Sequence, residues 1–327
     1  MPTAPPGRTT RPFGSVLTAM VTPFAPDGSL DLDAAAALAS RLVDEEAHDG
    51  LVVSGTTGES PTTSDAEKDR LLRAVLEAVG DRAVVVAGVG SNDTAHTLEL
   101  ARDAEKAGAH GLLVVTPYYN KPPQAGLLQH FRAAADATGL PVMLYDIPGR
   151  SGVPIEVETL VRAAEHPRIV AVKDAKGDLW ATSWALARTD LAWYSGEDAL
   201  NLALLSHGAA GVVSVVGHVA GPDYAEMVAA VDAGDLTRAR AVHTRLLPAV
   251  RGIMTRTQGA IAVKAALQLR GALPHRTTRP PLVDATDAEV ELLSSELALS
   301  GLLPAGVPTS STQPNASAAQ PAAEGAS

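Results

Sequence analysis

Lys173 is the residue whose type and position point most directly to covalent chemistry. It lies near the end of a short, β-branched apolar run, residues 168–175, which is typical of a strand buried on both faces. Burial strips water from an ammonium group, so its pKa falls and the free amine becomes a nucleophile. We therefore expect Lys173 to form a Schiff base with a carbonyl substrate. This run alone leaves open an ordinary strand-end lysine that reaches solvent or pairs with Asp174.

Further side chains suited to proton transfer and recognition follow other predicted strands. Tyr118 and Tyr119 lie in residues 116–122, and Tyr145 closes another apolar run. A phenol at a strand end can relay a proton, although packing also explains a tyrosine there. Arg150 lies in the turn after Tyr145, where its guanidinium either binds a planar carboxylate or faces solvent.

A loop of small and hydroxyl-bearing residues, Gly-Thr-Thr-Gly-Glu-Ser at 55–60, follows a further strand. Its glycines allow close backbone approach, and Thr56 and Thr57 with nearby N–H groups can hold a carboxylate or phosphate. The loop is equally explained as an ordinary connection to a helix that begins at Ser64 with a capping box. Histidines and carboxylates show no spacing typical of metal ligands, so we expect no metal.

The elements that must position these residues alternate between short apolar runs and longer amphipathic ones. Eight runs are strand candidates: residues 16–21, 50–54, 83–87, 111–115, 141–145, 169–173, 192–195 and 211–215. An open doubly wound sheet alternates in the same way but usually has fewer strands. Eight repeats predict an α/β fold, a closed (β/α)8 TIM barrel, in which the chemistry sits at the C-terminal ends of the strands.

We divide the chain into four parts on the same evidence. Residues 13–222 form the predicted barrel, and residues 223–302, with helices expected at 224–233, 235–247, 258–270 and 287–299, form a small C-terminal helical extension. Residues 1–12 are expected to be a disordered leader. Residues 303–327 are a low-complexity stretch with little apolar bulk, so we expect a disordered tail.

Composition excludes several classes of function. The 327 residues carry 26 basic and 37 acidic side chains, a net charge of −11 without a basic cluster, which argues against nucleic-acid binding. No apolar run is long enough to cross a membrane, and no signal sequence is evident. Cysteine is absent, which excludes disulfides and a thiol nucleophile and is compatible with the cytoplasmic location that we expect.

From about Gly14 to Leu302, the chain resembles the dihydrodipicolinate synthase and N-acetylneuraminate lyase superfamily of pyruvate-dependent class I aldolases. The resemblance rests on residues 55–60, 116–120, 145 with 148–150, 173 in its strand, and 195–198. It implies a Schiff-base-forming lyase of the (β/α)8 type that needs no cofactor. Lys173 would condense with pyruvate, and the enamine would attack L-aspartate 4-semialdehyde in diaminopimelate and lysine biosynthesis.

The resemblance also implies roles for the surrounding residues. Tyr145 would be the general acid/base, and Thr57 would link it to Tyr119, which in this family typically crosses a dimer interface. A homotetramer, a dimer of dimers, is therefore expected. Thr56 and Thr57 would hold the pyruvate carboxylate. The rest of the pocket would be formed by Val213, which lines it near the Schiff base, and Gly196, which leaves space beside it.

Arg150 separates the members of this superfamily. In the synthases, an arginine in a Pro-Gly-Arg turn receives the carboxylate of the semialdehyde, whereas sugar-acid aldolases need a polyol-recognising surface there. We therefore favour the synthase, with a sugar-acid or hydroxy-oxo-acid aldolase as the alternative and a non-catalytic barrel as a more distant one. Lys68 and His96 stand where lysine-inhibited synthases carry imidazole and carboxylate partners, so we expect weak or absent inhibition by lysine.

Overall fold

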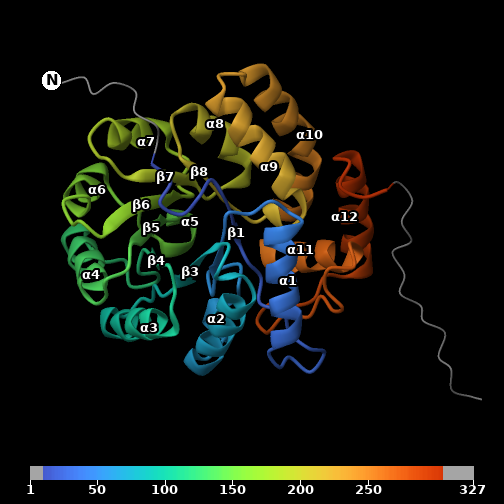
Figure 1. Ribbon diagram of the computed structural model, residues 1–327, viewed down its shortest axis with the longest axis horizontal. Coiled ribbons are helices and arrows are strands. Elements are labelled where there is room, and N and C mark those ends of the chain that lie inside the picture. Colours follow the sequence, from blue (N-terminus) through green and yellow to red (C-terminus); the bar gives the residue numbers. More distant parts are fainter. Residues whose placement is uncertain (1–9, 305–327) are drawn as a thin grey trace, which may run out of the picture.

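The computed structural model describes residues 10–304. Within this range, eight parallel strands each pair with the next in sequence, and β1 also pairs with β8, so the sheet closes into a barrel (Figure 1). The predicted (β/α)8 barrel is confirmed. The strands are β1 (Val16–Ala19), β2 (Gly50–Val53), β3 (Val84–Gly88), β4 (Gly111–Val115), β5 (Val142–Asp146), β6 (Ile169–Asp174), β7 (Ala192–Ser195) and β8 (Gly211–Ser214).

Helices lie between successive strands and form the outer ring of the barrel (Figure 1). They are α1 (Leu32–Asp44), α2 (Asp65–Val79), α3 (Thr94–Ala107), α4 (Gln124–Asp136), α5 (Pro148–Ser151), α6 (Val157–Ala163), α7 (Leu179–Leu186) and α8 (Asn201–Ser206), with short 3-10 turns η1 (Ser60–Thr62) and η2 (Asp198–Leu200). The capping box predicted at Ser64 is present, because its hydroxyl accepts from the Glu67 N–H while the Glu67 carboxylate accepts from the Ser64 N–H.

The apolar core has two layers, as the barrel requires. One layer fills the space between strands and helices, and a second, smaller cluster inside the barrel contains Leu17, Val52, Tyr194 and Val213. Because the strands are parallel, their C-terminal ends form one rim. All predicted site residues on strands, or directly after them, therefore come to the same side of the barrel.

Four helices follow β8: α9 (Gly217–Asp232), α10 (Leu236–Met254), α11 (Gly259–Leu269) and α12 (Asp287–Leu299). Helix α9 begins at Gly217 rather than near Tyr224, with non-helical backbone at Ala220 and a proline at position 222. The predicted boundary between barrel and extension therefore falls inside one helix. Figure 1 shows α11 and α12 on the side of the barrel occupied by α1.

The predicted leader and tail lie almost entirely in residues 1–9 and 305–327, outside the described residues. Arg11, which is described, donates to the Ala210 carbonyl at 2.7 Å and pairs with Asp232 at 2.7 Å. Among residues 10–304, none of the helices has the length and apolar character needed to cross a membrane.

Candidate active site

The pairing of β5 with β6 brings the predicted nucleophile and the predicted acid/base together. Tyr145 and Lys173 are direct partners in the register of the two strands. The Lys173 Nζ lies 4.2 Å from the centroid of the Tyr145 ring. Both side chains are buried, with 4% and 5% of their surfaces exposed. The amine therefore sits inside the barrel mouth against an aromatic face.

Burial controls the electrostatics of Lys173. Loss of hydration lowers its pKa to about 8, while the Asp198 carboxylate acts in the opposite direction and the charge of Arg150 lowers the pKa further. Among residues 10–304, no acceptor or carboxylate lies within hydrogen-bond or ion-pair distance of Nζ. The amine is thus desolvated and unpaired, which is the condition for a lysine nucleophile at neutral pH.

Asp174 does not neutralise Lys173, although the two are adjacent in sequence. Its Oδ2 accepts from the Thr182 hydroxyl at 2.6 Å and from the Trp193 indole N–H at 3.0 Å. Successive side chains of a strand point to opposite faces, so Asp174 faces the helices while Lys173 faces the barrel interior. The ion pair left open by the sequence is not formed.

Tyr145 is held in its protonated form by the same desolvation. Burial raises the pKa of its phenol, and the positive charge of Arg150 and a side-chain interaction with Thr56 offset this only in part. A neutral phenol beside a free amine can donate a proton to a departing oxygen and then recover one, as a general acid/base must.

A cavity of about 230 Å³ opens beside Tyr145 at the C-terminal rim of the barrel. Its lining includes Thr56, Tyr118, Tyr145 and Arg150. Lys173 is not among its lining residues, but its Nζ lies 4.2 Å from the ring centroid of Tyr145, which is. The cavity combines phenol, hydroxyl and guanidinium groups, which suits a small substrate with a carbonyl and carboxylates.

The structure separates the two adjacent threonines of the loop. Thr56 lines the cavity and interacts with Tyr145, whereas Thr57 is buried and does not line it. Of the two threonines, Thr56 is therefore the one beside Tyr145 within this chain, and the link through Thr57 to Tyr119 stays a prediction. The loop begins at Ser54, whose left-handed φ of 57° is unusual for a residue other than glycine.

Tyr119 points out of its own barrel. Its side chain is 90% exposed, and its φ of 75° is unusual for a residue with a bulky side chain. Tyr118, the other half of the pair, lines the cavity. A residue other than glycine with such a backbone is a feature that clusters at functional sites.

Gly196, after β7, supplies clearance for the nucleophile. A Cβ at this position would lie 2.7 Å from the Lys173 Cγ and 2.9 Å from its Cε. The interior face beside it includes Val213, which is buried in the cluster that also contains Tyr145. Arg150 lies on the short helix α5 and lines the same cavity from the exposed side.

The comparisons with known proteins agree with this geometry. The model of the dihydrodipicolinate synthetase family matches residues 12–299. The chain belongs to the dihydrodipicolinate synthetase family. It is 75% identical over 305 residues to a 4-hydroxy-tetrahydrodipicolinate synthase of Kineococcus radiotolerans, covering 93% of this chain and 99% of the relative. It is 68% identical over 290 residues to the synthase of Acidothermus cellulolyticus, covering 89% and 93%.

Solved structures give the same result for the fold. A dihydrodipicolinate synthase of Cyanidioschyzon merolae with lysine bound superposes with a TM-score of 0.87 at 42% identity, covering 90% of this chain and 100% of that one. The family and the enzyme class expected from the sequence, a lyase of the 4-hydroxy-tetrahydrodipicolinate synthase type, are thereby confirmed.

Two features of this family member were not singled out from the sequence. Asp198 was noted only as part of the turn after β7, yet it is buried, accepts from the N–H groups of Val215 and Val216 at 2.9 and 3.1 Å, and raises the pKa of Lys173. Glu59 was noted only as a loop residue, and its carboxylate is completely enclosed. Among the described residues, no group of three or more potential ligands could hold a metal ion.

Proposed function

We propose that this chain condenses pyruvate with L-aspartate 4-semialdehyde, the reaction of a 4-hydroxy-tetrahydrodipicolinate synthase in lysine biosynthesis. The observation that carries the proposal is the buried, unpaired Lys173 amine lying 4.2 Å from the Tyr145 ring centroid. High identity to proteins that carry this name supports the choice of substrates.

In the first half-reaction, the neutral Nζ of Lys173 attacks the ketone carbon of pyruvate. Tyr145 donates its proton to the oxygen, which leaves as water when the C=N bond forms. Thr56 and the backbone N–H groups of the loop that also contains Thr57 would hold the pyruvate carboxylate. The Tyr145 phenolate then takes a proton from the methyl carbon of the iminium, which gives the enamine and restores the phenol.

In the second half-reaction, the enamine carbon attacks the aldehyde carbon of the semialdehyde and a C–C bond forms. The aldehyde oxygen takes a proton as it becomes a hydroxyl, and Tyr145 is the acid placed to supply it. Arg150 would bind the semialdehyde carboxylate at the exposed side of the cavity, because a guanidinium offers paired donors to a planar carboxylate. No observation favours a polyol at this position.

The oligomer expected from the sequence, a dimer of dimers, remains part of the proposal. The exposed phenol of Tyr119 fits a residue that enters the site of a second copy. A separate apolar surface lies on α7, where the rings of Trp180 and Trp184 stack 6.3 Å apart and are both exposed. Sedimentation of the wild type and of Trp180→Ser with Trp184→Ser would test whether this surface joins dimers. A cytoplasmic location also remains a prediction.

We also propose that L-lysine inhibits this enzyme weakly or not at all. The Asp65 carboxylate already accepts from His96 Nε2 at 2.9 Å and pairs with Lys68 at 3.3 Å. A cationic effector arriving beside these residues would meet the Lys68 ammonium and the His96 ring, and the Asp65 carboxylate between them is already occupied. An inhibition constant for L-lysine in the sub-millimolar range would overturn this expectation.

A substrate panel tests the proposed reaction. The enzyme, saturated with pyruvate, is supplied in turn with L-aspartate 4-semialdehyde and with aldehydes derived from sugar acids, and kcat/KM is measured for each. We expect a clear preference for the semialdehyde. A higher kcat/KM for a sugar-acid aldehyde would reject the synthase in favour of the aldolase, and no turnover with any aldehyde would favour a non-catalytic barrel.

A further inference from the structure

A buried ion pair connects the C-terminal extension to the loop that carries Thr56. Lys264, on α11, donates from Nζ to the Glu59 Oε1 and, at 2.8 Å, to the Thr277 carbonyl. Both charged side chains are enclosed, and Lys264 has no exposed surface. Glu59 and Lys264 are 205 positions apart in the sequence, so the contact joins two distant segments of the chain.

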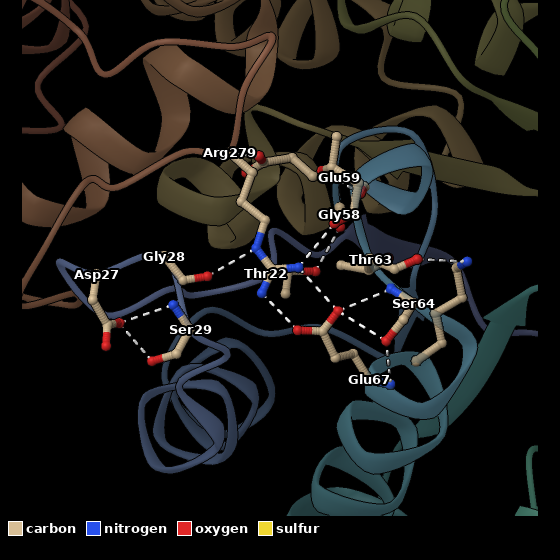
Figure 2. A network of polar contacts seen from close by, with 12 residues as sticks. Thr22, Asp27, Gly28, Ser29, Gly58, Glu59, Thr63, Ser64, Glu67 and Arg279 are labelled. Carbon is tan, nitrogen blue, oxygen red and sulfur yellow. Dashed lines mark hydrogen bonds and ion pairs between the residues drawn. The ribbon is translucent and has the colours of Figure 1, made fainter.

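Arg279 makes the second connection. Its backbone N–H donates to Glu59 Oε2 at 2.9 Å, so both carboxylate oxygens of Glu59 are held by the extension. Its guanidinium pairs with both oxygens of Glu67 at 2.6 and 2.9 Å and donates from Nε to the Gly28 carbonyl at 2.8 Å. Figure 2 shows this side chain reaching between the loop before α1 and the first turn of α2.

The loop between these anchors has a constrained backbone. Glu59 adopts a left-handed φ of 54°, and its N–H donates to the Thr56 carbonyl at 3.2 Å. The next N–H, of Ser60, donates to the Gly55 carbonyl at 3.3 Å. From the other side, the Thr22 hydroxyl donates to the Gly58 carbonyl at 2.6 Å. Any movement of Glu59 is therefore passed directly to the backbone around Thr56.

Stability alone is a poor explanation for this arrangement. Taking a carboxylate and an ammonium out of water costs about as much as their attraction returns, so apolar side chains of similar size usually stabilise a core as well or better. A fully satisfied buried pair does fix geometry, because each partner restricts the other to one position. The left-handed backbone at Glu59 is a local cost that such fixing would offset.

We infer that the C-terminal extension positions the carboxylate-binding loop of the active site, and that Glu59, Lys264 and Arg279 are positioning residues for the reaction. The inference rests on the proposed function, because it assigns to Thr56 and its neighbouring N–H groups the binding of pyruvate. It gives the extension a direct part in substrate binding. None of the three residues touches the reacting atoms.

The test compares Glu59→Gln and the double variant Glu59→Gln with Lys264→Met against the wild type. The double variant leaves no unpaired charge in the core, so it keeps the test open if the single variant folds poorly. The pyruvate concentration that gives half-maximal borohydride trapping is measured first, and KM for each substrate second. In both variants, we expect the pyruvate concentration for half-maximal trapping and KM for pyruvate to rise about tenfold. KM for the semialdehyde and the pH dependence of trapping should stay close to those of the wild type.

Glu296→Gln is the matched control. Glu296 is a buried carboxylate of the same extension, paired with Arg251 at 2.8 Å, but it lies between α10 and α12 and does not contact the loop. Its loss should lower the unfolding temperature while leaving the pyruvate values unchanged. Arg279→Lys should recover part of the wild-type pyruvate affinity that Arg279→Gln loses, because a lysine can keep one contact with Glu67.

The outcomes separate the inference from the proposed function. If the folded double variant traps pyruvate at the wild-type concentration, or if Glu296→Gln weakens trapping to the same degree, the positioning role is wrong. If the wild-type enzyme is not trapped by pyruvate at all, the proposed function itself fails. A rise in the pyruvate values confined to the variants of the loop network supports the inference.

Discussion

Lys173 and Lys264 are two buried lysines, one on a barrel strand and one paired with the loop that carries Thr56. Lys264 has no exposed surface and is fully paired, with the Glu59 carboxylate and the Thr277 carbonyl around its ammonium. Lys173 is 4% exposed and faces an aromatic ring. Burial lowers the pKa of both, but at Lys264 the charge of Glu59 works against this change at contact distance.

The difference shows how one fold uses the same side chain for two purposes. A buried ammonium with a carboxylate partner keeps its charge and fixes the position of the groups around it. A buried amine without a partner gives up its proton readily and can attack a carbonyl. Because Lys173 has no hydrogen-bond partner, it does not contribute the free energy of folding that a paired lysine would contribute.

The largest expected effects come from the paired variants Lys173→Met and Lys264→Met. Lys173→Met should reduce kcat by more than about 10³-fold, because the covalent intermediate cannot form. Its unfolding temperature should be no lower than that of the wild type, since the lost amine had no partner. Lys264→Met should destabilise the protein by about 3–5 kcal/mol, because the Glu59 charge remains buried alone. Calorimetry together with steady-state kinetics would measure both, and a stability loss at Lys173 as large as that at Lys264 would break the distinction.

Gly196→Ala should displace Lys173 without removing it. The new methyl group would lie 2.7 Å from the Lys173 Cγ, which is closer than real Cβ atoms come to carbon, so the lysine must shift. A nucleophile misplaced by about 1 Å can lose about 10²-fold in rate, and we expect a fall in kcat of this size. Gly149→Ala, where a Cβ would meet no atom within 4 Å, is the control. An unchanged kcat would show that Lys173 tolerates more freedom than its packing indicates.

Arg150→Met should affect the second substrate and the amine together. Loss of a charged hydrogen bond worth about 1.5–3 kcal/mol should raise KM for the semialdehyde at least tenfold. The pKa of Lys173 should also rise, because the charge of Arg150 lowers it. Arg238→Met, which removes an exposed arginine of the extension, is the control for surface charge. A higher KM for pyruvate with no change for the semialdehyde would reassign Arg150 to the first substrate.

The smallest of these effects is the dependence of the wild type on pH. With a pKa of about 8, roughly one-tenth of Lys173 is free amine at pH 7, whereas an ordinary lysine has far less. Because only the free amine attacks the carbonyl, kcat/KM for pyruvate should rise about tenfold per pH unit below this pKa and level off above it. A profile that keeps rising through about pH 10 would match an ordinary, solvated lysine.

Much of the fold follows from local sequence. Short apolar runs marked all eight strands, and the Ser64 capping box and the bounds of α12 matched the structure. Helix α9 did not, because its first turns contain two glycines and a proline, which are poor helix formers, and pack against β1 and β8. Residues 148–151 form a single helical turn that begins at Pro148 and ends at Gly152, which has a left-handed φ of 83°.

The site could be predicted where a reactive or charged residue lies at the end of a strand or in the turn directly after it. Lys173, Tyr145 and Arg150 met this condition, and the structure brings them together. The difference between Thr56, which lines the cavity, and the buried Thr57 did not, because two adjacent residues of the same type carry the same signal in the sequence. The partner of Glu59 lies 205 residues away on a helix whose local sequence gives no sign of it, so this contact required the folded chain.

Reductive trapping followed by peptide mapping tests the central claim most directly. The wild-type enzyme is incubated with pyruvate, reduced with borohydride and digested, and each lysine-containing peptide is weighed. The account predicts one pyruvate-derived adduct, on Lys173, with none on the equally buried Lys264 and none in Lys173→Ala. An adduct on any other lysine, or no adduct at all, would contradict the assignment of Lys173 as the Schiff-base nucleophile.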